Sequence, residues 1–408
     1  MPLTRRQVYR RRRIVALGSS VVALAVALYL PMALLAPIKP STTQIEPWNA
    51  PVVSAPVIDF PPYGASALGA VGYAGTLASA GDAAPLPIAS ISKVITALVV
   101  LDYKPLIGDD AGPPITFGPQ DEQFYENQRL DGGSVESVYS GQVLNQRTVM
   151  TVMLLASANN YAQSLASWAF GSEALYVERA RAWLISEGLS KTTIIDASGV
   201  SPSNRSTIAD LVEIAKIAEQ QPVVAAIVAL PSAEVADLGT VVNRNALVQT
   251  GGINGIKTGT LDEAGSCLLF SQNLLVGTVP VTVVGVVLGG PDHESVDAAV
   301  RSLLRQADTG FVSVRLATAG QAFARYSSVW GDTAAAVAER TVEAVIWSGT
   351  PIVKTLRLRE VLTAPVGAEV GNAIFTAGVQ DFPVTLRLDA AIDDPGPWWR
   401  MTNPTEIF

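Results

Sequence analysis

Three short motifs hold the side chains of this sequence that are best suited to covalent chemistry. In chain order they are Ser90-Ile-Ser-Lys93, Ser157-Ala-Asn159 and Lys257-Thr-Gly259. A serine hydroxyl is a weak nucleophile until a base removes its proton, and positions i and i+3 of a helix share one face. We therefore expect Lys93 to lie beside Ser90 and to act as its base. Each motif alone is common by chance, but the three in this order predict a serine acyl-transfer site.

The proposed base must be neutral to accept a proton, whereas lysine normally carries one at neutral pH. Burial in an apolar helix, together with a second positive charge from Lys257, is expected to lower the pKa of Lys93. The alternative for Ser90 and Lys93 is an N-cap serine followed by a surface lysine. The apolar residues around the lysine and the two other motifs favour the catalytic interpretation.

The second motif falls on a polar break between two expected helices, a place from which side chains reach a cleft. Ser157 is suited to relay a proton to a leaving amine. Asn159 is suited to hold a substrate carbonyl and the lysine together. Capping of the second helix by Ser157 and Asn160 is expected as well.

The third motif follows two glycine-rich turn signals, so we expect it to lie on a strand. Lys257 and Thr258 are suited to bind a substrate carboxylate, and Gly259 lets a substrate backbone lie close to the strand. The backbone N–H groups of Ser90 and Thr260 are expected to form an oxyanion hole. An edge strand with a basic residue is the alternative interpretation.

The composition excludes several other chemistries. The 408 residues include one histidine, His293, and one cysteine, Cys267. A single cysteine permits no internal disulfide and no cysteine-rich zinc site, and we expect it to be a small buried residue on a strand. His293 follows a strand in a turn and is expected on the surface, because no acid partner for it is identifiable. The net charge of −8 argues against a nucleic-acid-binding protein, and we expect neither a metal nor a cofactor.

Strands from both ends of one domain, with helices between them, must position these motifs. Helices are expected at residues 90–101, 147–170 with a break at 157–160, 173–187, 208–220 and 295–307. Strands are expected within residues 65–80 and, as an antiparallel hairpin, at 265–271 and 281–288. This order predicts an α+β domain over residues 64–311, with an antiparallel sheet flanked by helices.

A second domain is expected where the sequence texture changes, from about Val312. Short β-prone runs then alternate with turns, at Val342–Trp347, Ile352–Leu358, Ala373–Ala377 and Pro383–Leu388. Residues 312–408 are therefore predicted to form a smaller all-β domain. Before the first domain, residues 37–63 are rich in proline and poor in charge. They are expected to be an extracytoplasmic spacer that lifts the first domain off a membrane.

The N-terminus carries the signals of a membrane segment. Residues 1–13 form an arginine-rich tail, and residues 14–36 are uncharged. As a helix, these 23 residues reach ~34 Å, which is enough to cross a bilayer. We expect an uncleaved, single-pass anchor in the cytoplasmic membrane, with the basic N-terminus inside. A cleaved signal peptide is the alternative, although its apolar core usually has only ~7–15 residues.

Together these features resemble the serine-type D-alanyl-D-alanine carboxypeptidases, the low-molecular-mass penicillin-binding proteins of cell-wall synthesis. Beyond the three motifs, the resemblance includes the segments Pro87–Lys93, Leu155–Asn160, Asp196–Gly199, Ser206–Leu211, Asn243–Asn245 and Gly255–Gly259. It covers roughly Val71 to Phe311, and the second domain is similar to the family's β-rich C-terminal domain. It implies the β-lactamase and penicillin-binding-protein transpeptidase fold.

The resemblance also implies roles for the motif residues. Ser90 is then the nucleophile and Lys93 its base, with Ser157 and Asn159 as the second catalytic pair. Substrate binding then falls to the third motif, with the residues Lys257, Thr258, Gly259 and Thr260.

Three features depart from the family pattern. Leu261 stands where a threonine or serine often lies, two residues after the glycine of the third motif. A basic residue often follows the late strand, but here Gly289-Gly290 leads to Pro291-Asp292-His293. This leaves Arg244 as the extra carboxylate ligand. The chain also ends at Phe408 without the amphipathic anchor helix of many relatives.

The function implied by the resemblance is removal of the terminal D-alanine from peptidoglycan stem peptides that end in D-Ala-D-Ala. An acyl-enzyme forms on Ser90, and β-lactam antibiotics form one on the same serine. The expected partners are this peptide, β-lactams and the cytoplasmic membrane, without nucleic acid, and the catalytic domain faces the cell wall. Two alternatives stay open: a serine β-lactamase, for which no glutamate base is identifiable, and a catalytically weak wall-binding homologue.

Overall fold

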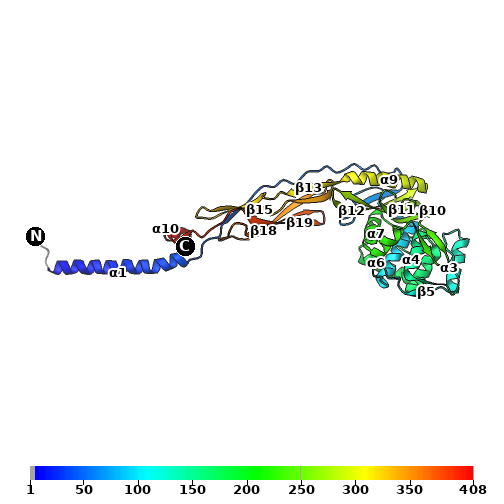
Figure 1. The fold of residues 1–408 in the computed structure, drawn as a ribbon, viewed down its shortest axis with the longest axis horizontal. Coiled ribbons are helices and arrows are strands. Elements are labelled where there is room, and N and C mark those ends of the chain that lie inside the picture. The colour runs from blue at the N-terminus through cyan, green and yellow to red at the C-terminus, as the bar shows by residue number, and fades with distance from the viewer. Residues whose placement is uncertain (1–4, 249, 408) are drawn as a thin grey trace.

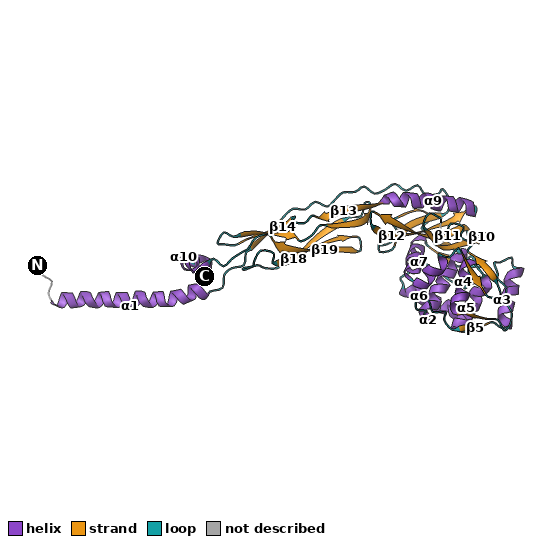
Figure 2. Ribbon diagram, in the orientation of Figure 1, coloured by secondary structure: helices purple, strands orange, loops and turns teal. Residues whose placement is uncertain are grey.

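The computed structural model of the chain is elongated, with a lone helix at one end and a helix-rich domain at the other (Figure 1). It describes residues 5–248 and 250–407. Residues 1–4 of the expected basic tail and Phe408 of the expected β-rich domain lie outside the described residues. A region built mostly of strands connects the two ends, as Figure 2 shows.

The motif-bearing domain is built on a five-stranded antiparallel sheet with the strand order β10-β11-β12-β2-β3. The strands are β2 Ala65–Ala70, β3 Ala78–Gly81, β10 Ile253–Leu261, β11 Gly265–Val276 and β12 Val279–Gly290. Because β12 pairs with β2, strands from the two ends of the domain lie side by side. The predicted α+β architecture is therefore confirmed.

The hairpin of β11 and β12 is longer than the sequence predicted. The sequence predicted strands at 265–271 and 281–288, but both strands continue to the pair Val276↔Val279, and Gly277, with φ of 65°, closes the turn. Across the hairpin, Thr282 Oγ1 donates a hydrogen bond to Asn273 Oδ1 (2.9 Å). Gln272 and Asn273 are adjacent polar residues and Gly277 favours a turn, so the local sequence indicated a connection, whereas pairing with β12 keeps Gln272 and Asn273 in the strand.

Helices cover one face of this sheet and bury the first motif. Helix α2 (Ser92–Tyr103) is buried at every position from Ser92 to Leu101, as its uniformly apolar sequence predicted. The neighbouring helices are α3 Pro119–Leu130, α4 Gln146–Leu155, α5 Asn159–Phe170, α6 Glu173–Ser186, α7 Ile208–Gln220 and α8 Pro222–Val228. The segments that connect these helices form three small two-stranded sheets. The paired strands are β4 Leu86–Pro87 with β7 Arg205–Ser206, β5 Pro114–Thr116 with β6 Val143–Asn145, and β8 Ser232–Val235 with β9 Gly239–Val242.

Helix α9 (His293–Gly310) covers the opposite face of the sheet. Its apolar stripe, which includes Val300 and Leu303, packs in one cluster with Leu268 and Phe270 of β11. The intervening strand residue Leu269 belongs to the core on the other face. The sheet is thus buried on both sides, with alternate residues of each strand facing different helices.

The second domain contains a six-stranded sheet with the order β1-β14-β15-β19-β18-β17, and a two-stranded sheet of β13 and β16. The strands after residue 310 are β13 Phe311–Ala317, β14 Ala322–Ser327, β15 Thr333–Ala338, β16 Val342–Trp347, β17 Ile352–Leu358, β18 Glu369–Ala377 and β19 Gln380–Leu388. A β-rich C-terminal region follows the first domain, as the sequence predicted.

The proline-rich segment is not a free spacer. Strand β1 (Thr42–Ile45) pairs with the edge of β14, and the ring of Trp48 packs 5.0 Å from that of Phe375. Further on, the backbone N–H of Asp59 donates to Gln306 Oε1 of α9 (2.6 Å). The segment is extended, as expected, but it covers an edge that would otherwise present unpaired backbone groups. A composition rich in proline and poor in charge does not distinguish a docked extended segment from a free one.

Both ends of the described chain are helical. Helix α1 (Arg5–Leu35) is the one helix in the described ranges that is long and apolar enough to cross a membrane. Two short helices that the sequence did not predict, α10 (Gly396–Thr402) and α11 (Pro404–Ile407), follow the last strand. Figure 1 places α10 beside the C-terminal end of α1.

Candidate active site

The first motif places a buried lysine against a partly exposed serine. A short 3₁₀ helix, Ala89–Ile91, leads into α2, so Ser90 lies at the start of the helix and Lys93 lies one turn later. Lys93 Nζ donates to Ser90 Oγ (2.8 Å), Asn159 Oδ1 (2.7 Å) and the carbonyl of Ser198 (2.6 Å). The predicted contact between Ser90 and Lys93 is therefore present, and Asn159 of the second motif joins it.

The surroundings of Lys93 favour its neutral form. The side chain is fully buried, and burial lowers the pKa of Lys93 well below its usual value. The positive charges of Lys257 and Arg244 lower this pKa further, whereas Asp196 opposes them. Burial therefore contributes most, and Lys257 supplies the second charge that the sequence suggested.

The second motif lies on the break between α4 and α5. Ser157 has φ of 59° and is 4% exposed, and it lines a cavity together with Ser90. Asn159 Nδ2 donates to Gln128 Oε1 (2.9 Å), which fixes the amide so that its oxygen faces the lysine. The expected capping by Ser157 and Asn160 is wrong: Ala158 is the N-cap residue, and Asn160 instead binds the backbone of Glu136.

The third motif lies on β10, which packs against the 3₁₀ helix of the first motif. A Cβ atom at Gly259 would lie 3.1 Å from Ala89 Cβ and 3.3 Å from the backbone nitrogen of Ser90. Glycine thus permits the close approach of β10 to the nucleophile. Lys257 is 2% exposed, and burial, aided by Arg244, lowers the pKa of Lys257 to about 7.

All three motifs line one pair of adjoining cavities. The basic cavity, about 350 Å³, includes Ser90, Ser157 and Thr258 in its wall and is flanked by Arg244 and His293. The acidic cavity, about 610 Å³, shares Ser90 and Thr260 and includes Asp131, Asp262 and Glu263. The serine hydroxyl therefore lies between a surface suited to an anion and a surface suited to a cation.

Arg244 and His293 lie on opposite elements at the basic cavity. Arg244 follows β9 and donates from Nη1 to Ser134 Oγ (2.7 Å), so it reaches the site as the sequence predicted. His293 is exposed, as expected, but its Nε2 lies 2.7 Å from Thr260 Oγ1. No spacing pattern in the sequence indicates this contact, because Thr260 and His293 lie on different elements, 33 residues apart.

The loop after α6 is a further part of the site that the motifs did not reveal. Asp196 Oδ1 accepts hydrogen bonds from the backbone N–H groups of Ser198 (2.8 Å) and Gly199 (2.6 Å). This turn presents the Ser198 carbonyl to Lys93. A Cβ atom at Gly199, which has φ of 84°, would lie 2.0 Å from the carbonyl oxygen of Ala89, so only glycine fits there. The sequence signal was an Asx-type turn, Asp196-Ala-Ser-Gly199.

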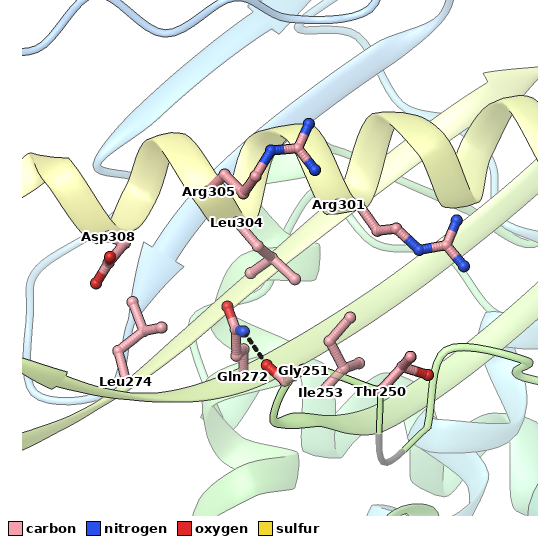
Figure 3. Close-up of a pocket in the computed structure, with 9 residues that line it drawn as sticks. All are labelled: Thr250, Gly251, Ile253, Gln272, Leu274, Arg301, Leu304, Arg305 and Asp308. Atoms are coloured by element: carbon pink, nitrogen blue, oxygen red, sulfur yellow. Dashed lines mark hydrogen bonds between the residues drawn. The ribbon is translucent and has the colours of Figure 1, made fainter.

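Other candidate sites do not compete with this one. Cys267 is buried on β11, as predicted, and burial raises the pKa of its thiol to about 11. Within residues 5–248 and 250–407, no cluster of three or more metal-ligating side chains is present. A separate cavity of about 320 Å³ lies between α9 and the β10–β11 edge, with Asp308 above Leu274 and Leu304 above Gln272 (Figure 3). It contains none of the motif residues.

Known proteins are similar to this chain over the part that contains the three motifs. A family model described as D-alanyl-D-alanine carboxypeptidase matches residues 74–291. A D-alanyl-D-alanine endopeptidase of Pseudomonas aeruginosa is 31% identical over 237 residues, which are 56% of this chain and 71% of that protein. A D-alanyl-D-alanine endopeptidase of Escherichia coli is 27% identical over 209 residues, which are 48% of this chain and 62% of that protein.

Solved structures share the fold. Penicillin-binding protein 5 from Haemophilus influenzae superposes with a TM-score of 0.58 at 18% identity, covering 85% of this chain and 100% of that one. A peptidoglycan synthesis regulatory factor, PBP3, from Streptococcus pneumoniae gives 0.61 at 20% identity, covering 81% and 99%. Penicillin-binding protein D2 from Listeria monocytogenes, in its cefotaxime-bound form, gives 0.50 at 26% identity, covering 60% and 96%.

Proposed function

The chain belongs to the D-alanyl-D-alanine carboxypeptidase family, and from that premise we propose that it removes the terminal D-alanine from peptidoglycan stem peptides through a Ser90 acyl-enzyme. The observation that carries the proposal is the contact of a fully buried lysine with a cavity-facing serine, Lys93 Nζ to Ser90 Oγ at 2.8 Å. When neutral, Lys93 keeps two N–H groups for Asn159 Oδ1 and the Ser198 carbonyl, and its lone pair can take the hydroxyl proton of Ser90 as the oxygen attacks.

The reaction then proceeds in two steps. Ser90 Oγ attacks the carbonyl carbon of the D-Ala–D-Ala bond, and the backbone N–H groups of Ser90 and Thr260 stabilise the oxyanion. The C–N bond breaks, and the proton held by Lys93 passes through Ser157 to the leaving amine, which departs as D-alanine. Water next attacks the ester carbonyl and gives a proton to the Lys93 amine; the bond between the acyl carbon and Ser90 Oγ then breaks, Lys93 returns that proton to Ser90 Oγ, and the shortened peptide leaves with a new terminal carboxyl group. Asn159 keeps Lys93 in place throughout.

The basic cavity supports recognition of a terminal carboxylate. Lys257 and Thr258 lie on β10 beside Ser90, Gly259 allows the substrate backbone to approach, and Arg244 and His293 flank the same cavity. Charge-assisted hydrogen bonds to a carboxylate are roughly twice as strong as neutral ones. We assign the leaving D-alanine to the basic cavity and the remainder of the stem peptide to the acidic cavity.

A second candidate is endopeptidase action on cross-linked peptides, which the names of the Pseudomonas and Escherichia coli relatives favour. The test incubates the purified protein with a pentapeptide ending in D-Ala-D-Ala and, separately, with a cross-linked muropeptide dimer. Carboxypeptidase function predicts D-alanine release from the pentapeptide, absent in Ser90→Ala. Cleavage of the dimer without D-alanine release would instead make the protein an endopeptidase. Absence of both reactions would contradict the hydrolase proposal.

We also propose the placement of the protein. Helix α1 crosses the cytoplasmic membrane, its arginine-rich start remains inside, and residues 37–408 face the cell wall. Contacts between α1 and α10 support a retained rather than a cleaved segment, because Ala33 is fully buried and the carbonyl of Ala36 accepts from Arg400 Nη1 (2.7 Å). N-terminal sequencing of the mature protein tests this: a start near Pro37 would identify a cleaved signal peptide.

The same proposal divides the chain into functional parts. The basic tail is 1–13, the membrane segment 14–36, the proline-rich segment 37–63, the catalytic domain 64–311 and the β-rich domain 312–408. The docked course of residues 42–59 along β14 and α9 makes the third part a strap between the two domains.

A further inference from the structure

The outer end of α1 is covered by the C-terminal helix α10. From Tyr9 to Leu28 every residue of α1 is exposed, whereas Tyr29 is half-buried and Ala33 is fully buried. Tyr29 Oη donates to the carbonyl of Met401 (2.6 Å). Figure 1 shows α1 projecting alone from the molecule, with α10 beside its last turns. The protein therefore leaves the first part of the apolar helix bare and covers only the part after Leu28.

The covering helix has the composition of a membrane–water boundary. Its sequence from Gly396 to Thr402 contains two tryptophans. Trp399 packs edge-on against Trp330 (5.9 Å between ring centres), but Trp398 remains 75% exposed. The neighbouring Arg400 is paired with Asp394 (2.7 Å). Tryptophan and tyrosine gather where lipid headgroups meet the hydrocarbon, because their rings are apolar at one end and polar at the other.

The position of Tyr29 along α1 determines how deep α10 lies in the membrane, because Tyr29 contacts α10. Tyr29 lies seven residues before Ala36, the end of the apolar run, which is ~10 Å along a helix. If the whole run crossed the hydrocarbon, the Met401 end of α10, which contacts Tyr29, would lie ~10 Å inside it, with the polar backbone end of that helix in a dry medium at a cost, while Arg400, which donates to the carbonyl of Ala36, would lie at its edge. Counting inward from Tyr29 instead, a core of ~30 Å takes about 20 residues of helix and reaches Arg10, so that the arginines 10–13 form its innermost turn. Long arginine side chains reach the inner headgroups from that position.

We propose that α10 lies in the headgroup layer of the outer leaflet of the membrane that α1 crosses, with Trp398 inserted between the lipids. The proposal rests on the proposed membrane span of α1, and it moves the outer edge of the span from Ala36 to Tyr29. The last turns of α1 and helix α10 then form one support on the membrane surface. The catalytic domain lies at the opposite end of the elongated molecule (Figure 1).

The experiment measures tryptophan fluorescence of the full chain in vesicles of phosphatidylcholine and phosphatidylglycerol. The lipids carry bromine, a short-range quencher, either close to the headgroup or close to the bilayer centre. Three proteins are compared: the natural chain, Trp398→Phe, and the matched control Trp168→Phe, which removes a tryptophan of the catalytic domain. Phenylalanine keeps an aromatic ring at each position, so the fold of all three is retained.

Shallow bromine is expected to quench part of the emission, and Trp398→Phe is expected to lose most of that quenching while Trp168→Phe keeps it. Deep bromine is expected to quench less than shallow bromine. Equal shallow quenching with and without Trp398, or stronger quenching by deep bromine, would overturn the proposal. Extraction of the chain from the vesicles by alkaline carbonate would overturn it through the loss of the membrane span. D-alanine release, assayed on the same vesicles, reports the enzymatic proposal separately.

Discussion

Replacement of Asp196 by asparagine tests whether the loop at residues 196–201 tunes the candidate base. The two oxygens of Asp196 have different partners. Oδ1 accepts from the backbone of Ser198 and Gly199, and Oδ2 accepts from the backbone N–H of Ser201 (3.0 Å) and from Asn204 Nδ2 (3.1 Å). Asparagine keeps an acceptor at Oδ1 but places an NH₂ group opposite two donors. The loop therefore loses two hydrogen bonds to a charged group.

The loss of stability follows from that count. A hydrogen bond to a charged group contributes ~1.5–3 kcal/mol, and water can replace part of it because Asp196 is only partly buried. We expect the free energy of unfolding of Asp196→Asn to fall by about 3 kcal/mol. Denaturant unfolding measures this quantity. Asp210→Asn is the matched control, because Asp210 also binds a buried side chain, accepting from Thr192 Oγ1 (2.8 Å).

The effect on catalysis has a definite sign. The negative charge of Asp196 raises the pKa of Lys93 against burial, Lys257 and Arg244, which lower it. Without that charge the pKa falls further, so the amine is neutral at lower pH. The acidic limb of the acylation rate is then expected to move to lower pH in Asp196→Asn but not in Asp210→Asn. The assay is the second-order rate constant of labelling by a fluorescent penicillin across about pH 4–9. An unmoved limb, or a shift to higher pH, would refute the reasoning.

Three further predictions follow from the site. Lys93→Ala is expected to slow acylation by about 10²–10⁴-fold with the circular dichroism spectrum retained, and near-normal labelling would show that another group is the base. Lys257 has a pKa of about 7 when folded and 10.5 as its ordinary value, so the unfolded state binds an extra proton between these pH values. The free energy of unfolding should then rise with pH across this window, by up to about 1.4 kcal/mol per pH unit more than in Lys257→Met. Urea unfolding at several pH values measures this; the same pH dependence in both proteins would argue against a depressed pKa of Lys257. His293→Leu removes a hydrogen bond to Thr260 and is expected to raise KM for a pentapeptide by roughly fivefold, with a smaller change in kcat. His293→Gln is expected to restore KM. An unchanged KM in His293→Leu would show that His293 does not contribute to substrate binding.

The motif contacts could be predicted because they depend on local periodicity. Ser90 and Lys93 meet through the i to i+3 spacing of one helix, and the apolar run after Lys93 already indicated its burial. The longer helices and the late hairpin of the motif-bearing domain were predictable for the same reason, whereas α3, α8 and the short pair of β8 and β9 were not predicted. Gly259 marked a close approach of backbones, although the sequence did not identify the 3₁₀ helix at Ala89 as one of the neighbours.

The remaining parts of the site depend on contacts between distant elements. Nothing in the local sequence relates His293 at the start of α9 to Thr260 on β10, or the carbonyl of Ser198 to Lys93. Contacts with distant elements also determine that the proline-rich segment is docked, because its composition is equally suited to a free and to a docked extended chain. The helix α10 is too short to produce a periodic signal, and its contact with Tyr29 spans almost the whole chain.

Covalent labelling of Ser90 by penicillin is the most direct test of the central claim that a lysine-activated serine acts in this cleft. The intact protein is treated with benzylpenicillin, digested and analysed by mass spectrometry, with Ser90→Ala as the control. The account predicts one penicilloyl group on the peptide that contains Ser90, and none in Ser90→Ala. Attachment to another residue, or no adduct at saturating penicillin, would contradict the account.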